Sequence, residues 1–202
     1  MLAEIRSALR PAFVLLFLLT ALTGIAYPLA ITGIAQAVFP SQANGSLIID
    51  GGKVVGSELI GQNFVDARYF HPRPSAAGKG YDASASAATN LAPGSKDLRD
   101  AIAARVADAR ATDIGAQGPS GVDVPPDLVT TSASGLDPDL SPEAALFQVG
   151  RIAKARGMPP QSIRALVHGA IQYPLFGIIG EHRVNVLLLN RQLDRISAKP
   201  AQ

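Results

Sequence analysis

Apolar residues form one long uninterrupted block near the start of the chain and shorter, interrupted segments after it. No charged residue occurs from Pro11 to Ile49, and residues 12–35 are almost wholly apolar. A bilayer core of about 30 Å needs roughly 20 helical residues at about 1.5 Å each. The block exceeds that length, so we predict a transmembrane helix over residues 12–35 that tilts or continues past the lipid.

Two other interpretations of the block fit less well. A secretory signal peptide has a shorter apolar core, and the small-residue triplet Ala35-Gln36-Ala37 lies far downstream of this one. The second interpretation, a buried core helix of a soluble protein, fits less well because the block is apolar on every face. Pro28 lies inside the block and predicts a kink.

Charges beside the block predict its orientation. Arg6 and Arg10 precede it, and the next Lys or Arg is Lys53. Because cytoplasmic flanks carry the excess of Lys and Arg, we expect residues 1–11 in the cytoplasm and residues 40–202 outside. This interpretation describes a single-pass membrane protein.

The pattern after Pro40 changes to alternating short strands and helices. Residues 46–50 and 53–56 flank Gly51-Gly52 and predict a β-hairpin with a tight turn. From Gly78 to Ser95 the chain is rich in Ala, Ser and Gly, which predicts a long loop or a mobile lid.

Helix signals dominate the remainder. Ser95 caps a predicted helix that reaches about Ala111, with an apolar stripe of Leu98, Ile102 and Val106. Capping residues and terminal glycine or proline predict three further helices. The first covers residues 141–156 and stops at Gly157, and the second begins at Pro159-Pro160. The third covers residues 184–196, either with Asn185 as its cap or with its first residues as a strand. We therefore predict one compact α+β domain.

Composition narrows the classes of function. The net charge is +2, and beyond residue 50 the 16 Lys and Arg are interspersed with 14 Asp and Glu, which is no nucleic-acid footprint. The absence of cysteine excludes disulfides, thiol catalysis and thiolate metal sites.

Enzyme signatures are missing from the sequence. Neither Gly-Lys pair, Gly52-Lys53 or Gly78-Lys79, is followed by the Ser or Thr of a phosphate-binding loop. The histidines, at positions 71, 168 and 182, have no metal-ligand spacing. Asp137 and Asp139 flank Pro138 and are typical of turn acids rather than of a catalytic pair. We predict no catalytic residue, no metal site and no tightly bound cofactor.

Several short segments, in order along nearly the whole chain, resemble the C subunit of the bacterial Kdp potassium-transporting P-type ATPase. They are Arg10-Pro11, Tyr27-Pro28, residues 42–46, 59–64 and 69–76, Asn90-Leu91, and residues 124–127, 131–141 and 183–187. One departure is Asp139, where family members often carry histidine after Asp-Pro, so a role that needs an imidazole there is in doubt.

The resemblance implies a non-catalytic subunit of a high-affinity potassium uptake complex. Its partners would be a channel-like A subunit, an ATP-hydrolysing P-type B subunit and a small F peptide. The family is described as needed for assembly and as raising the ATP affinity of the B subunit, so ATP is expected only within the complex. Gln148 and Arg151 share one face of a predicted helix and are candidates for an ATP contact. The outward orientation, where ATP is scarce, favours instead a polar stripe that faces solvent or a subunit.

Two groups of residues are candidates for contacts within such a complex. The first lies in proline-containing loops that are shaped before docking, which lowers the entropic cost of binding; its members are Tyr69, Phe70, Arg73, Asp137 and Pro138. The second offers small and polar groups to neighbouring membrane helices; its members are Thr20, Thr23, Gly24 and Tyr27.

Two rival functions remain open at this level. One is a membrane-anchored extracytoplasmic hydrolase that would use Ser134 with His168 or His182. The other is an anchored solute-binding protein. A stable monomer in detergent would favour the second, whereas a subunit travels with larger partners.

Overall fold

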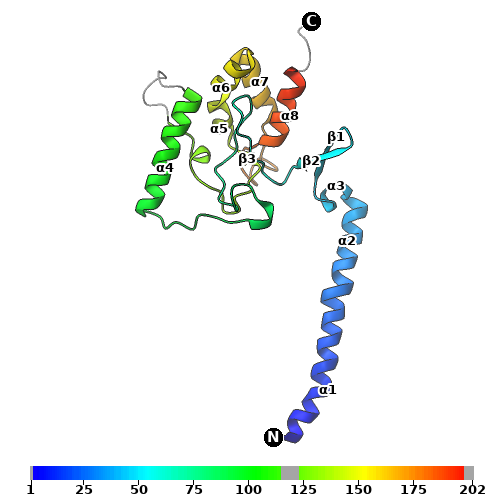
Figure 1. Ribbon diagram of the computed structural model, residues 1–202. Coiled ribbons are helices and arrows are strands. Elements are labelled where there is room, and N and C mark those ends of the chain that lie inside the picture. Colours follow the sequence, from blue (N-terminus) through cyan, green and yellow to red (C-terminus); the bar gives the residue numbers. More distant parts are fainter. Residues whose placement is uncertain (1, 115–122, 198–202) are drawn as a thin grey trace. The chain divides into compact units, whose positions relative to one another are not determined.

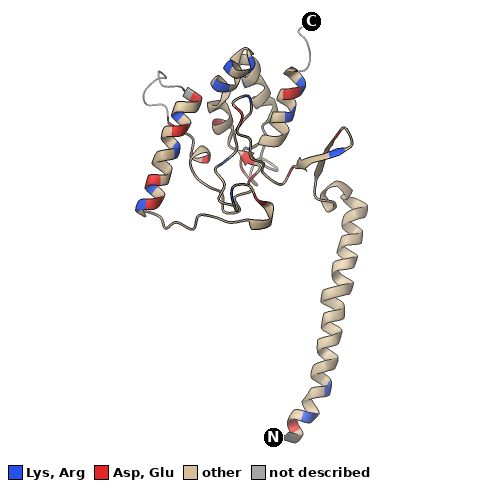
Figure 2. Cartoon of the chain, viewed as in Figure 1, with Lys and Arg blue, Asp and Glu red and all other residues tan. Residues whose placement is uncertain are grey.

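The computed structural model describes residues 2–114 and 123–197, and these divide into two compact units, 1–47 and 48–202. The first unit is helical. It consists of α1 (Leu2–Leu19), a π-helical segment (Thr20–Ala26), α2 (Tyr27–Val38) and the short α3 (Pro40–Ala43). Residues Ala3–Val38 form one helix long and apolar enough to cross a membrane, and Figure 2 shows its charged residues only near the N-terminus.

Pro28 changes the hydrogen bonding of this helix, as its position predicts. The N–H of Tyr27 bonds to the carbonyl of Leu22, five residues earlier, and closes the π-helical segment directly before the proline. Thr23 Oγ1 adds a bond of 2.7 Å to the Leu19 carbonyl. A widened turn relieves the clash between a proline ring and the preceding turn, so the predicted kink site appears as a local π-helix.

The second unit begins with the predicted hairpin. Strands β1 (Leu47–Asp50) and β2 (Lys53–Ser57) pair with each other. Gly51 and Gly52 between them have φ of +55° and +79°, the left-handed values that a tight hairpin turn requires. Residues 58–95 follow as an extended loop with one 3₁₀ turn at Ala83–Ala85, which confirms the long loop.

Four helices pack together in the C-terminal half of this unit (Figure 1). They are α5 (Pro142–Phe147), α6 (Val149–Arg156), α7 (Pro160–Ala170) and α8 (Val186–Ser197). Two short strands, β3 (Asp139–Leu140) and β4 (Val184–Asn185), pair antiparallel beside them. The completely buried core side chains come from all of these elements and include Leu140, Val149, Ile152, Ile163, Val167, Val184, Leu189 and Leu193.

Local sequence signals explain where these helices begin and end. Ser141 accepts a hydrogen bond of 3.2 Å from the N–H of Ala144, and Gly157 ends α6 with φ +64°. Asn185 accepts one of 3.1 Å from the N–H of Leu188, so the residue caps α8 while it also belongs to β4.

The single helix predicted over residues 141–156 is instead two helices, α5 and α6. The N–H of Gln148 bonds to the Ala145 carbonyl, three residues earlier, and this tighter turn separates the two.

Helix α4 (Lys96–Ala109) begins at Ser95 as predicted and continues as a π-helical turn, Arg110–Ile114. Ser95 accepts a hydrogen bond of 3.2 Å from the N–H of Leu98. The predicted stripe of Leu98, Ile102 and Val106 is only half-buried. A 3₁₀ turn at Pro126–Leu128 leads back from this region toward β3.

Candidate functional site

The two loops predicted to dock partners lie against each other, although about 60 residues separate them in the sequence. The N–H of Gly61 donates to the Leu136 carbonyl at 2.8 Å. Ser75 Oγ donates to the Gly135 carbonyl at 2.6 Å. Further along, the N–H of Ala87 bonds to Ser134 O at 3.1 Å. We call the segments 59–77 and 130–141 the paired loops.

Glycines allow the backbones of the paired loops to approach this closely. Gly135 has φ +68°, and a Cβ there would lie 2.7 Å from the nitrogen of Ala77 and 2.8 Å from the oxygen of Ala87. A Cβ on Gly61 would lie 2.6 Å from the oxygen of Asp137. These are backbone atoms that cannot rotate away, so larger residues would force the loops apart.

An ion pair joins the paired loops at their surface. Arg73 Nη1 and Asp137 Oδ2 are 2.8 Å apart, and both side chains are largely but not fully buried. The Tyr81 hydroxyl donates to the Arg73 carbonyl, and burial raises the pKa of Tyr81 above its usual range. In the described part of the chain, the buried Nε of Arg73 has no hydrogen-bond partner. Arg73 is therefore held in position while one of its donors stays unused.

Above this ion pair the surface forms a shallow hollow of about 570 Å³, which we call the docking hollow. Exposed Leu59 and half-exposed Ile60 form its apolar side. Its other lining residues include Arg73, Ser132, Leu136, Asp137 and Pro138. An apolar rim beside one partly desolvated charge pair is typical of a protein–protein interface.

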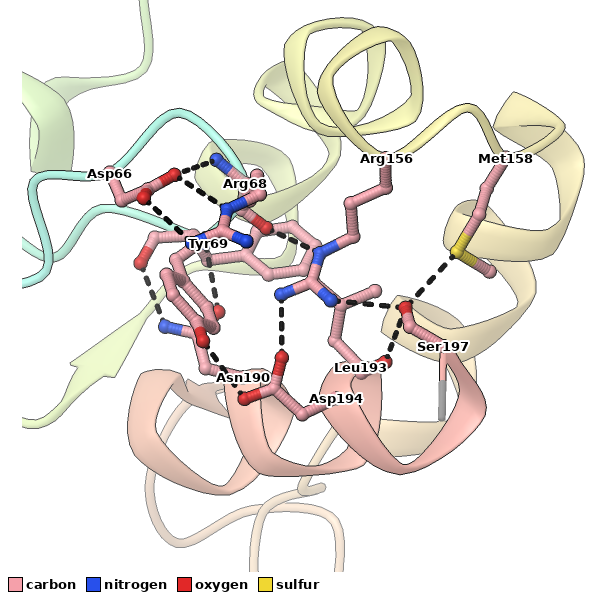
Figure 3. A network of polar contacts seen from close by, with 10 residues as sticks. Asp66, Arg68, Tyr69, Arg156, Met158, Asn190, Leu193, Asp194 and Ser197 are labelled. Atoms are coloured by element: carbon pink, nitrogen blue, oxygen red, sulfur yellow. Dashed lines mark hydrogen bonds and ion pairs between the residues drawn. The ribbon is translucent and has the colours of Figure 1, made fainter. Parts of the chain in front are cut away.

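Tyr69 and Phe70, the other two predicted docking residues, hold the loop onto the helices. Figure 3 shows the Tyr69 hydroxyl directed at Asp194 of α8. The hydroxyl donates to Asp194 Oδ2 at 3.0 Å. The guanidinium of Arg156 lies over the Tyr69 ring, 4.9 Å from the ring centroid. Phe70 is completely buried, and Asn190 bonds to both its N–H, at 2.8 Å, and its carbonyl, at 3.0 Å. The Phe70 ring therefore offers no surface to a partner in this conformation.

Gln148 and Arg151 do lie on one face, as their spacing predicts, but that face is inside the domain. Gln148 is fully buried, and Arg151 is 8% exposed. Gln148 Oε1 accepts hydrogen bonds of 2.7 Å from both the His71 N–H and Arg151 Nη2. Its Nε2 donates to the carbonyls of His71, at 3.0 Å, and Ala144, at 3.3 Å.

The guanidinium of Arg151 is equally occupied. Nε donates to Asp113 Oδ1 at 2.6 Å, and both of these side chains are buried. Nη1 donates to the carbonyls of Ala67, at 2.7 Å, and Tyr69, at 2.9 Å. We call Gln148, Arg151 and Asp113 the buried clamp, because together they fix residues 67–71 on α6.

A cavity of about 550 Å³ lies next to the buried clamp. Its polar lining includes His71, Arg73, Tyr81, Arg105, Asp108 and Gln148. Burial, reinforced by the charge of Arg151, lowers the pKa of His71. The cavity is polar enough for a small ligand, but the hydrogen-bonding atoms of Gln148 already have partners inside the protein.

Asp139 lies in β3 beside Asn185 and Arg183. Its carboxylate accepts a hydrogen bond of 3.2 Å from Asn185 Nδ2 and lies 3.5 Å from Arg183 Nη1. Burial raises the pKa of Asp139 despite the nearby arginine.

The structure also locates the residues of the rival hydrolase. Ser134 Oγ accepts from the N–H of Leu136 at 3.1 Å and lies 3.4 Å from Ser132 Oγ, while the ring of His182 stacks edge-on against Tyr173. Within residues 2–114 and 123–197, no group of three or more His, Asp or Glu could hold a metal ion.

The membrane-facing candidates are all exposed on the isolated chain. Thr20, Thr23 and Gly24 belong to the π-helical segment, and Tyr27 begins α2. A side chain added at Gly24 would meet only Thr20 Cγ2, at 3.9 Å.

Sequence reasoning missed Arg156, Asn190 and Asp194, which hold loop 66–70. One signal was available. Asn190 interrupts the apolar face of α8, and a polar residue at a core position normally has a specific hydrogen-bond partner. Nothing in the local sequence identifies Phe70 as that partner.

The fold defines a class: an α+β protein that carries, within the described residues, one helix long and apolar enough to cross a membrane. The family model described as K⁺-transporting ATPase, c chain (KdpC) matches residues 9–195. The chain therefore belongs to the KdpC family.

Similar proteins cover nearly the whole chain. A protein of Caulobacter vibrioides named potassium-transporting ATPase KdpC subunit is 58% identical over 93% of both chains. Proteins of the same name from Variovorax paradoxus and Bradyrhizobium diazoefficiens are 55% and 53% identical, each over 95% of this chain and 98% of their own.

We expect Gly135→Ala to lower the free energy of unfolding by about 2 kcal/mol or more, because alanine is strained at positive φ and its Cβ would meet backbone atoms. The measurement is urea unfolding of the full chain in detergent, followed by circular dichroism. Gly169→Ala is the matched control, since Gly169 lies in α7 with nothing within 4 Å of the added Cβ. Equal stability of the two variants would contradict the close approach of the loops.

Proposed function

We propose that this chain is a non-catalytic accessory subunit of a potassium-transporting ATPase and that it helps to assemble and stabilise the complex. Membership of the KdpC family and the names of its relatives support this proposal. The structural observation that carries it is the pairing of loops 59–77 and 130–141 around the docking hollow. A surface that is already held in shape loses little entropy when a partner binds.

The docking hollow is proposed to contact the larger subunits, first of all the channel-like A subunit. Leu59 and Ile60 supply apolar area, and the Arg73–Asp137 pair supplies a polar contact at the centre. The ATP-hydrolysing B subunit and a small F peptide are the other expected partners.

The domain is proposed to lie outside a bacterial inner membrane, with the N-terminus in the cytoplasm. Arg6 and Arg10 precede the membrane helix, and no Lys or Arg follows until Lys53. In this orientation the domain would cap the potassium entrance or brace the A subunit.

The effect on ATP affinity that the family resemblance implies is proposed to be indirect. The buried clamp has its polar atoms bonded to Ala67, Tyr69, His71 and Ala144. A direct contact of ATP with Gln148 and Arg151 stays a prediction, and it would need these hydrogen bonds to break.

Leu59→Glu should reduce the recovery of the larger subunits severalfold when the complex is purified through a tag on this chain. The substitution places a charge on the apolar side of the docking hollow without touching the core. Val54→Glu is the control, because Val54 in β2 is 59% exposed against 61% for Leu59 and lies outside the hollow. Undiminished recovery with Leu59→Glu would count against docking through this surface.

The orientation is measured by cysteine labelling, for which the cysteine-free chain needs no prior change. Cysteine in place of exposed Lys154, on α6, should react with a membrane-impermeant maleimide in intact spheroplasts. Cysteine in place of Ser7, in the N-terminal tail, should react only after the membrane is opened. The reverse pattern would show an inward domain and would revive direct ATP contact.

Gly24→Leu should loosen the complex, seen as a lower yield of intact assembly in detergent. A Cβ at Gly24 meets only Thr20 Cγ2, at 3.9 Å, so a loss of assembly reports a neighbouring helix that needs the small residue. Ala26→Leu adds the same side chain two positions further along and serves as the control. Equal yields for both variants would indicate that the helix is a passive anchor.

A further inference from the structure

Residues 172–183, between α7 and β4, form a protruding hairpin that we call the apolar finger. Exposed large apolar side chains gather on it, with Phe176 84% and Ile178 83% exposed. The others are Tyr173, Leu175 and Ile179. No charged residue occurs from position 165 to position 180. Soluble surfaces rarely carry so dense an apolar group unless something covers it.

Several backbone groups of the apolar finger bond to one another. Leu175 and Ile179 exchange bonds of 2.9 and 3.0 Å, and Gln172 and Arg183 exchange bonds of 2.8 and 3.1 Å. The N–H of Gly177 bonds to the Pro174 carbonyl at 3.0 Å, and that of Ile178 to the Leu175 carbonyl at 3.2 Å. Most N–H groups of the tip therefore have partners within the finger, which lowers the free-energy cost of moving this backbone into lipid.

The turn at the tip holds apolar side chains outward. Phe176 has φ +55° and Gly177 has φ +76°. A left-handed conformation is unfavourable for an aromatic residue, so the closed hairpin must impose it. Because Leu175, Phe176, Ile178 and Ile179 are all exposed, the tip is apolar all round rather than on one flat face.

Polarity rises from the tip to the base of the finger. Behind the tip, the ring of Tyr173 packs edge-on against His182, with centroids 5.2 Å apart. At the base, Arg183 Nε donates to Gln172 Oε1 at 3.1 Å. The finger is thus apolar at its tip, aromatic at Tyr173 and His182, and polar at its base. In one leaflet of a bilayer, acyl chains, the interface and water follow in the same order.

We infer that the tip of the apolar finger, residues 174–179, inserts into the lipid bilayer. Residues 39–46 separate α2 from β1 and span at most about 30 Å, so the start of β1 is tethered to the end of the membrane helix. A protein partner would be matched by one apolar face, whereas a tip that is apolar all round matches a fluid apolar medium. The inference requires only the membrane helix and holds for either orientation of the domain.

The test uses the full-length chain, reconstituted alone into phosphatidylcholine–phosphatidylglycerol liposomes. Single cysteines replace Phe176 or Ile178 and carry an environment-sensitive fluorophore. Cysteine in place of Val65 is the matched control, since Val65 is 75% exposed and lies outside the finger. Circular dichroism verifies that each labelled variant is folded, and a second pair at Leu175 and Ile179 replaces any that is not.

Brominated lipids should quench the probes at positions 176 and 178 severalfold more strongly than the probe at position 65, with a blue shift of their emission. Equal, weak quenching at all three positions would overturn the inference. Probes at the tip that become shielded only when the other ATPase subunits are present, without quenching by brominated lipid, would assign the tip to a protein partner and also overturn it. Neither outcome depends on whether Leu59→Glu weakens assembly, so the two proposals fail separately.

Discussion

The buried clamp is the interaction on which the second unit, residues 48–202, depends. Arg151 reaches from α6 to Asp113 and to the backbone of residues 67–69, while Gln148 bonds both the N–H and the carbonyl of His71. Removing one member of such a buried pair typically costs about 3–5 kcal/mol, since the remaining charge is left unpaired. These hydrogen bonds fix residues 67–71, a loop with little regular structure of its own.

The shape of the docking hollow depends on the fixed position of residues 67–71. Once residues 67–71 are held, Phe70 fills the core and Tyr69 reaches Asp194, so the continuing chain arrives at Arg73 in a defined place. Arg73 then pairs with Asp137, and the glycines at 61 and 135 let the two backbones meet. The shape of the docking hollow is thus a consequence of interior polar contacts.

The N-terminal helix and the second unit follow different physical rules. In the helix the backbone is satisfied locally, and Thr23 Oγ1 also donates to a carbonyl of the same helix, that of Leu19. In the second unit, long-range hydrogen bonds between side chains and backbone replace a large sheet, because β3–β4 has only a short ladder. Such an architecture explains why Gln148 and Arg151, which look like ligand-binding residues in the sequence, are used internally.

The sequence by itself determined those features that rest on local patterns or ordered motifs. They are the apolar span, the Gly51-Gly52 hairpin, the capped helix starts at Ser95 and Ser141, the stop at Gly157 and the family. Only the tertiary structure decided that loops 59–77 and 130–141 touch, that Phe70 faces the core, and that the face of Gln148 and Arg151 points inward. Helical periodicity groups residues on a face, but which face is covered depends on segments far away in the chain. Those pairings are selected by the combined burial and hydrogen bonding of the whole domain, which no short stretch of sequence contains.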